Sequence, residues 1–163
     1  MFAIGEIIDL AVKIEKNAEK VYRDAATEVA NPSLVSLLHW LADEEVKHAK
    51  WFSELKQKVK KTIDDPQLED MGKAILQDAL GDQTFSLKDV DLSKLEEVEN
   101  LLERAIEFES DTILFYEMIR SFVEDKDKET LDHLNAIIEE EKSHVRLMEE
   151  FLDTETMEPD ERQ

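Results

Sequence analysis

The sequence contains no cysteine, and only three of its 163 residues are glycine and three are proline. Without cysteine the chain has no disulfide framework, no thiolate ligand for zinc or an iron–sulfur cluster, and no nucleophilic thiol. Any metal ion must therefore bind to carboxylate or imidazole groups. The scarcity of glycine and proline, together with abundant Glu, Lys, Leu, Ala and Ile, favours long helices over tight turns. We therefore expect an all-α protein, and this length suits one domain with a sizeable core.

Basic residues are also few, since 20 Lys and Arg against 41 Asp and Glu give a formal net charge of -21. Nucleic acids and anionic membranes are bound through clustered Lys and Arg, so we expect neither partner. Most acidic residues are expected on solvated helix faces. Acidic residues interrupt every apolar run well before the roughly 18 residues that a membrane span needs. No basic region precedes the first apolar residues, so we expect a cytoplasmic protein.

Apolar residues recur at helical spacing in four segments, at about 4–29, 32–60, 94–123 and 128–152. Asn31 followed by Pro32 predicts the start of the second helix, and Ser93 and Glu96 have the spacing of a capping box before the third. Short connections join the first helix to the second and the third to the fourth. Each pair is therefore expected to form an antiparallel hairpin.

A longer connection, at 61–93, separates the two predicted hairpins. After Asp64-Asp65-Pro66 it contains a predicted short amphipathic helix that could end at Gly81 and whose apolar residues are Leu68, Met71, Ile75 and Ala79. A connection of this length can cross the whole height of a bundle, which is the single-crossover topology of ferritin-like folds. We therefore expect a ferritin-like four-helix bundle at 1–152, followed by a disordered acidic tail at 153–163.

Ionisable residues interrupt the apolar stripe of every predicted helix near its middle. Two helices each contribute one Glu and two contribute a Glu-x-x-His motif, which gives Glu15, Glu45, His48, Glu109, Glu141 and His144. Counting residues from each hairpin turn places the carboxylates of a hairpin at about one level. Buried unpaired carboxylates are strongly disfavoured. This ligand set is that of the di-iron and di-manganese carboxylate bundles, so the sequence predicts a site for two iron or manganese ions.

Tyr22 and Tyr116 each follow a stripe Glu by seven residues and so share its helix face. We expect each hydroxyl to bond to a metal-binding carboxylate, with plain core packing as the alternative. Thr112 lies one turn after Glu109 as either a polar neighbour of the metals or a packing residue.

Other candidate residues lie off the ligand stripes. Glu44 and Glu140 directly precede the ligand glutamates and are expected in solvent. Trp40 and Trp51 are expected to serve in packing rather than in cofactor binding, and His39 and His133 are expected at the surface or in satisfied contacts.

The chain resembles the rubrerythrin branch of the ferritin-like superfamily in the order of its motifs: Glu15, Tyr22, Glu45-Val46-Lys47-His48, Glu109, Tyr116, Glu141-Lys142-Ser143-His144. The resemblance covers nearly the whole chain. It implies two iron ions that are bridged by Glu45 and Glu141, with Glu15 and Glu109 as terminal ligands and one histidine on each iron. Rubrerythrins reduce hydrogen peroxide at a diferrous site, while ferritins and bacterioferritins oxidise ferrous iron at similar sites.

Two departures from the rubrerythrin pattern limit what the resemblance implies. Rubrerythrin proper carries a rubredoxin-like domain whose cysteines bind a further iron, whereas this chain has no cysteine. Electrons must then come from an unidentified external donor. Rubrerythrins also have an extra Glu three residues after the ligand of the third helix, where this chain has Thr112. Without this Glu, the resemblance does not imply redox-linked ligand exchange or efficient peroxide turnover for this chain.

The function that we expect is that of a non-haem di-iron oxidoreductase. It would reduce peroxide or dioxygen at a carboxylate-bridged site, with manganese or a mixed pair as alternative metals, and it would form a homodimer. One alternative is a ferroxidase or iron-handling ferritin-like protein. The other is a metal-free helical interaction module, in which the stripes are misphased and the charged residues face water.

Overall fold

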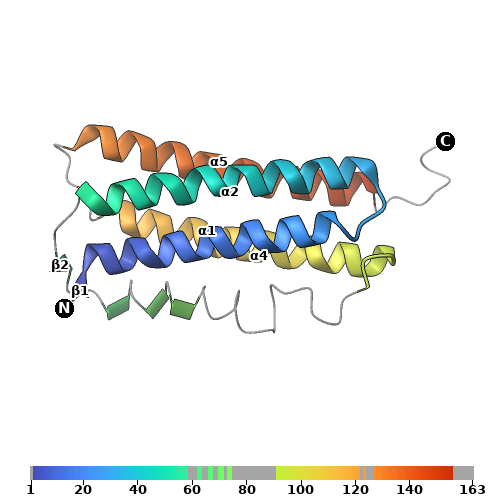
Figure 1. Cartoon of the computed structure of the whole chain (residues 1–163), viewed down its shortest axis with the longest axis horizontal. Helices are drawn as coiled ribbons and strands as arrows, with labels where there is room; N and C mark the ends of the chain where they lie inside the picture. Colours follow the sequence, from blue (N-terminus) through green and yellow to red (C-terminus); the bar gives the residue numbers. More distant parts are fainter. Residues whose placement is uncertain are drawn as a thin grey trace.

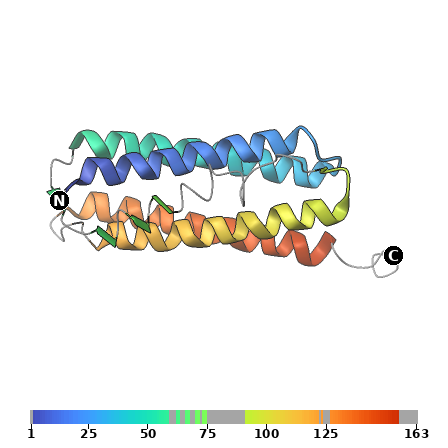
Figure 2. The same cartoon turned by 90° about the horizontal axis from the view of Figure 1, so that it is seen from below.

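Four long helices dominate the computed structural model, which describes residues 2–58, 62–63, 66–67, 70–71, 73–74, 91–121, 123 and 127–155. The helices are α1 (Ile4–Ala26), α2 (Pro32–Lys58), α4 (Leu95–Arg120) and α5 (Lys128–Glu155). Helices α1 and α2 form one antiparallel hairpin and α4 and α5 form the other, and the two hairpins pack lengthwise into a bundle (Figures 1 and 2). The predicted all-α, ferritin-like four-helix architecture is confirmed.

Two helix ends differ from the predicted bounds. Helix α1 ends at Ala26 rather than at about residue 29, because the chain uses residues 27–31 to reverse direction before Pro32. Helix α5 continues to Glu155, so the first three residues of the predicted disordered tail are helical. Phe151 and Leu152 pack against the core and hold this last part of α5 in place. The rest of the predicted tail, from residue 156, lies outside the described residues.

The start of α2 follows the predicted capping pattern. The side-chain Oδ1 of Asn31 accepts hydrogen bonds from the backbone N–H groups of Ser33, at 2.8 Å, and Leu34, at 3.3 Å. Pro32 is the first helical residue, where its missing N–H has no helical partner to lose. Asn31 is therefore the N-cap of α2.

The capping box predicted at Ser93 and Glu96 is wrong. Helix α4 begins at Leu95, and the residue before it, Lys94, has extended backbone and makes no side-chain cap bond. Asp91 explains the difference, because its Oδ1 accepts hydrogen bonds from both the backbone N–H and the hydroxyl of Ser93. The Ser93 hydroxyl is thus engaged before it can cap the helix.

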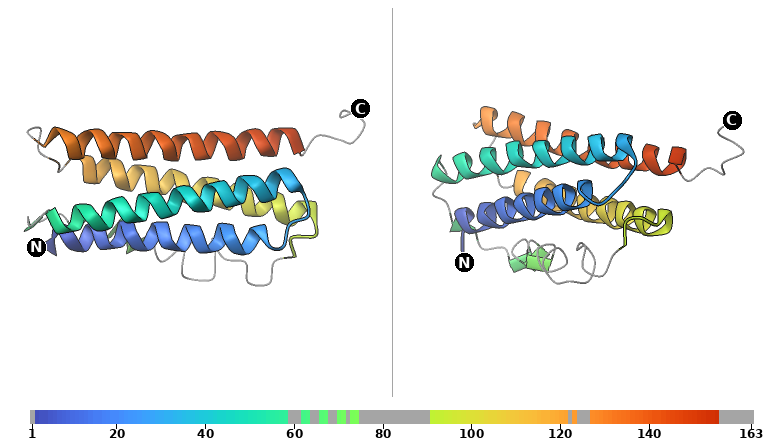
Figure 3. Two further views of the ribbon diagram at one scale, coloured as in Figure 1. Left: turned by 45° about the horizontal axis from the view of Figure 1, so that its top comes forward. Right: turned by 45° about the vertical axis from the view of Figure 1, so that its right-hand side comes forward.

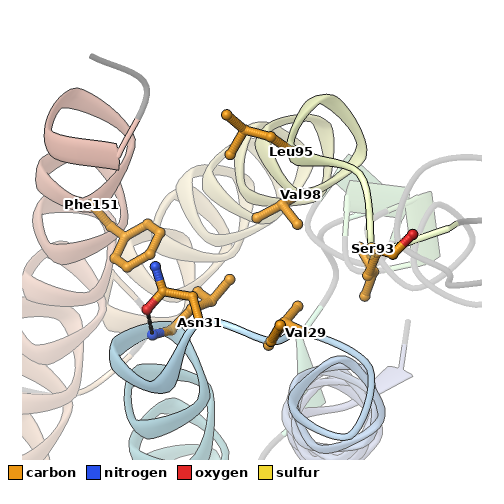
Figure 4. Close-up of a pocket in the computed structure, with 9 residues that line it drawn as sticks. Val29, Asn31, Ser93, Leu95, Val98 and Phe151 are labelled. Atoms are coloured by element: carbon orange, nitrogen blue, oxygen red, sulfur yellow. Dashed lines mark hydrogen bonds between the residues drawn. The ribbon is translucent and has the colours of Figure 1, made fainter. Parts of the chain in front are cut away.

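The start of α4 lies at the end of the bundle that holds the α1–α2 turn. A pocket of about 170 Å³ at this end is lined by residues of the turn, by the start of α4 and by Phe151 near the end of α5 (Figure 4). Helix α2 ends at the opposite end of the bundle (Figure 3), so α2 and α4 run in the relative directions that a single-crossover topology requires. Of the predicted short helix in this crossover, Met71 is helical and packs against the core. Leu68, Ile75, Ala79 and Gly81 lie outside the described residues.

A small β-pair was not predicted. Strand β1 (Phe2–Ala3) pairs antiparallel with β2 (Thr62–Ile63), so that Phe2 lies opposite Ile63 and Ala3 opposite Thr62. The pair joins the beginning of the described chain to the segment that follows α2. It does not change the fold class.

The core fills the space between the two hairpins along the whole bundle. Its large buried side chains come from all parts of α1, α2 and α4, and include Ile8, Ile14, Leu38, Leu41, Phe52 and Phe115. Helix α5 adds Leu134, Ile138 and Met148. None of the helices that the structure describes has an apolar stretch long enough to cross a membrane.

Candidate metal centre

Six ionisable side chains from four helices meet in the middle of the apolar core, and each exposes 2% of its surface or less. They are the predicted ligands Glu15 of α1, Glu45 and His48 of α2, Glu109 of α4, and Glu141 and His144 of α5. The amphipathic stripes explain this position, because each of these residues lies on the face that its helix turns toward the core. The structure therefore brings all six predicted residues together.

The six residues form two overlapping groups of possible ligands. Glu15, Glu45, His48 and Glu141 make the first group, and Glu45, Glu109, Glu141 and His144 make the second. Within each group one ligand atom from every residue lies within 4.8 Å of the others. Glu45 and Glu141 belong to both groups, so each of these carboxylates could reach two metal ions at once.

Two buried tyrosines donate hydrogen bonds to Glu15 and Glu109, the outer carboxylates, which each belong to only one ligand group. The hydroxyl of Tyr22 on α1 donates a hydrogen bond to Glu109 Oε1 on α4 at 2.6 Å. The hydroxyl of Tyr116 on α4 donates to Glu15 Oε1 on α1 at 2.5 Å. Each tyrosine thus binds the Glu of the opposite hairpin rather than the Glu on its own helix. These two bonds connect the hairpins and fix one oxygen of each outer carboxylate.

The second oxygens of Glu15 and Glu109 are buried without a hydrogen bond to any described residue, and so are several other polar atoms of the cluster. Within the part of the chain that the structure describes, no hydrogen-bond partner meets these buried atoms: Glu15 Oε2, Glu45 Oε1, Glu109 Oε2, Glu141 Oε2, and Nδ1 and Nε2 of His144. Buried polar atoms are normally paired, because leaving one without a partner costs about 1–3 kcal/mol. One such atom from each of five cluster residues fits a site that is completed by metal ions.

The two histidines direct Nδ1 toward the carboxylates. His48 Nδ1 lies 2.8 Å from Glu141 Oε1 and 3.6 Å from Glu15 Oε1. His144 Nδ1 lies 3.2 Å from Glu45 Oε1 and 3.3 Å from Glu141 Oε2. The two imidazole rings stack with their centres 5.8 Å apart. Nδ1 is therefore the atom through which each histidine could bind a metal ion in this cluster.

Burial and mutual repulsion change the acidity of the cluster. Burial raises the pKa of Glu15, Glu45 and Glu109, and the charge of Glu141 raises all three further. Burial also raises the pKa of Tyr22 and Tyr116 well above 10, and the charges of Glu109 and Glu15 respectively act in the same direction. Both tyrosines therefore remain protonated donors at neutral pH.

His48 and Glu141 behave as an ion pair in the absence of metal. Burial opposes the charged form of His48, but the charge of Glu15 and the hydrogen bond that His48 donates to Glu141 raise its pKa to about 12. Burial opposes the charge of Glu141 as well, but the neighbouring Glu109, His144 and His48 favour its charged form and bring its pKa well below 4.5. Without metal the cluster is thus neutralised by protons, which a metal ion would displace.

Of the two glutamates beside the cluster that were predicted to be solvated, Glu140 is exposed but Glu44 is not. Glu140 is about half exposed, but its Oε2 lies 2.6 Å from Nε2 of His48 on the other hairpin. The side chain of Glu44 exposes only 14% of its surface and pairs with Lys47 at 3.0 Å. The sequence gives one sign of these contacts, which is that each glutamate directly precedes a ligand. A long side chain at that position can reach around the helix.

The predictions for the tryptophans and for the remaining histidines hold. Trp51 is half-buried and packs against the core, where its ring contacts Phe52. Trp40 is 42% exposed and packs edge-on against the ring of His144, with 5.3 Å between the ring centres. His39 and His133 are exposed, and His133 stacks on Trp51.

Thr112 is buried one turn after Glu109, and its hydroxyl donates a hydrogen bond to the backbone carbonyl of Phe108 at 2.9 Å. This bond satisfies the hydroxyl within α4. Thr112 therefore contributes neither charge nor a free oxygen to the cluster.

Residues 6–100 match the rubrerythrin family. The match covers more than half of the 163 residues. The chain belongs to the rubrerythrin family. The match contains Glu15, Glu45 and His48, while Glu109, Glu141 and His144 lie beyond it and are placed by the second hairpin. No curated protein and no solved structure matches the chain. Rubrerythrins bind iron, so the family and the cluster of carboxylates and imidazoles both favour a di-iron site in this chain.

Proposed function

We propose that the chain is a di-iron oxidoreductase that reduces peroxide or dioxygen. The observation that carries this proposal is the pair of overlapping ligand groups that share Glu45 and Glu141 in a buried layer. Glu45 and Glu141, which belong to both groups, would hold both irons, Glu15 and Glu109 would each hold one of them, and each histidine would contribute its Nδ1. Two ferrous ions held there would supply the two electrons that hydrogen peroxide takes up, with two protons, to give two waters.

The residues around the cluster prepare it for this chemistry. Tyr22 and Tyr116 each donate a hydrogen bond to Oε1 of Glu109 or Glu15 and leave the buried Oε2 of that glutamate without a hydrogen bond among the described residues. Such partners fix the orientation of a ligand and tune its basicity. Buried apolar side chains, among them Leu41, Ala105 and Ile138, exclude bulk water from this part of the core. The sequence has no cysteine for an electron-transfer cluster, so a separate donor protein or reductant must return the electrons.

One observation favours a second function, ferrous oxidation by dioxygen. Rubrerythrins have a further Glu at the position of Thr112, and the hydroxyl of Thr112 is used within its own helix. The cluster therefore has one carboxylate fewer for the ligand exchange that accompanies peroxide reduction. A more symmetric site of this kind is also compatible with a ferroxidase.

The two functions can be separated by mixing the anaerobic, ferrous-loaded protein with hydrogen peroxide or with dioxygen in a stopped-flow spectrometer. We expect one equivalent of peroxide to oxidise both irons of a chain, and to do so faster than dioxygen. Rapid oxidation by dioxygen with little reaction toward peroxide would instead establish the ferroxidase. A protein that binds no iron would overturn both and leave the metal-free helical module.

A further inference from the structure

The two histidines of the cluster differ at their outer nitrogens. Helix α5 presents consecutive carboxylates to both nitrogens of His48, with Glu141 Oε1 at 2.8 Å from Nδ1 and Glu140 Oε2 at 2.6 Å from Nε2. Glu140 itself is about half exposed, while the His48 side chain is 3% exposed. The imidazole of His48 is therefore held from both sides by the opposite hairpin.

The Glu-x-x-His motifs of α2 and α5 form a twofold repeat, in which each motif is directly preceded by a further Glu, Glu44 or Glu140. This repeat predicts the same arrangement around His144, with Glu44 in the role of Glu140, but the described residues do not show it. Glu44 pairs with Lys47 on its own helix at 3.0 Å. Neither ring nitrogen of His144 makes a hydrogen bond within the described residues. The ring of Trp40 packs edge-on against the His144 ring instead, at 5.3 Å between centres. The twofold repeat is thus broken at the outer nitrogens.

This difference matters for metal binding through Nδ1. An imidazole that binds a metal through one nitrogen carries its proton on the other, and the partner of that N–H sets both the tautomer and the ring orientation. Glu140 supplies such a partner for His48. No described residue does so for His144, whose ring is held by packing against Trp40 rather than by a hydrogen bond.

We propose that Glu140 is a positioning residue for His48, and that the half-site of Glu15, Glu45, His48 and Glu141 binds the first of two metal ions. This inference rests on the proposed two-metal function and adds an order of filling to it. Loss of a partner of this kind typically lowers metal affinity about 10- to 100-fold. The two half-sites should therefore differ in affinity by about the same factor.

The test is a calorimetric titration of the metal-free chain with Co²⁺ alone. The wild-type protein should bind Co²⁺ in two steps whose dissociation constants differ by about 10- to 100-fold. Glu140→Ala should weaken the first step by a similar factor, and Glu140→Asp should restore part of it. Glu140→Gln is a second variant that preserves side-chain size, and it should weaken the step less because its amide oxygen still accepts a hydrogen bond. The matched control is Glu44→Ala, which should leave both steps unchanged.

A second readout separates positioning from general stability. At one equivalent of Co²⁺, proton NMR of the wild-type protein and of Glu44→Ala should show one strongly shifted ring N–H that exchanges slowly with water. In Glu140→Ala this signal should be lost to exchange, because the N–H of His48 then has no acceptor.

Two results would overturn the inference and leave the two-metal function intact: equal affinities for both Co²⁺ ions in the wild-type protein, or an unchanged first step in Glu140→Ala. A wild-type protein that binds no Co²⁺ would overturn the proposed function together with the inference.

Discussion

The shared and unshared carboxylates of the cluster should differ in how much metal-dependent stability they support. Glu45 belongs to both ligand groups, whereas Glu15 belongs to one. A ligand present at a hundredfold excess over its dissociation constant stabilises a folded protein by about 2.7 kcal/mol per site, or about 5.4 kcal/mol for two sites. For a chain of 163 residues each kcal/mol raises the melting temperature by about 2–4 °C. Saturating metal should therefore raise the melting temperature of the wild-type protein by about 11–22 °C.

The variants should lose different shares of this increase in melting temperature. Glu45→Gln removes a ligand of both groups and should abolish nearly all of the increase. Glu15→Gln removes a ligand of one group only, the group that we propose binds the first metal ion, and should lose at least half of the increase while it keeps the part that the other group supports. Glu44→Gln, which alters the neighbouring carboxylate outside both groups, should keep the full increase. The assay is differential scanning calorimetry of each protein with and without Mn²⁺, which avoids oxidation during the scan. Equal losses in Glu45→Gln and Glu15→Gln, or a loss in Glu44→Gln, would refute the shared-ligand arrangement.

Three further predictions concern the protein without added metal. Three cluster carboxyls have raised pKa values and so keep protons that the unfolded chain loses above about pH 4.5, and His48, with a pKa of about 12, does the same above pH 6.5. Stability should thus fall as pH rises from 5 to 9 in urea unfolding, and metal should reduce this fall; a metal-free protein that is most stable at pH 9 would contradict it. The lowered pKa of Glu141 acts in the opposite sense, with loss of stability below about pH 4.5. Tyr22→Phe leaves Glu109 Oε1 without its donor and should lower the free energy of unfolding by about 1–3 kcal/mol; no change would show that the bond is absent in solution. Asn31→Ala removes the N-cap of α2 and should cost about 1 kcal/mol, measured in the same way, whereas Asn31→Gly should cost only a few tenths.

The sequence was sufficient to predict the bundle and the six cluster residues, because both depend on the helical period. Residues spaced by three and four positions share one face, so a Glu or His on an apolar stripe must enter the core together with its neighbours. Glu45 and His48 are found in this way from one helix alone. Their neighbours on the other hairpin follow from the same pattern, without knowledge of how the helices pack.

Contacts between helices could not be predicted from the helical spacing of residues along the sequence. Glu140 lies about 100° around α5 from Glu141, and its bond to His48 depends on how the two hairpins are packed. The partners of Tyr22 and Tyr116 are likewise exchanged between hairpins, which spacing along one helix does not reveal. The predicted cap at Ser93 failed for a local reason, since Asp91 competes for the same hydroxyl.

The account depends most directly on whether the cluster holds two iron ions. The decisive measurement is elemental analysis of the freshly and anaerobically isolated protein beside its Glu45→Gln variant, with circular dichroism to establish that both are folded. The account predicts two iron ions per wild-type chain and almost none in Glu45→Gln, because this carboxylate is a member of both ligand groups. A wild-type protein without bound metal, or a variant that retains as much iron as the wild type, would contradict it.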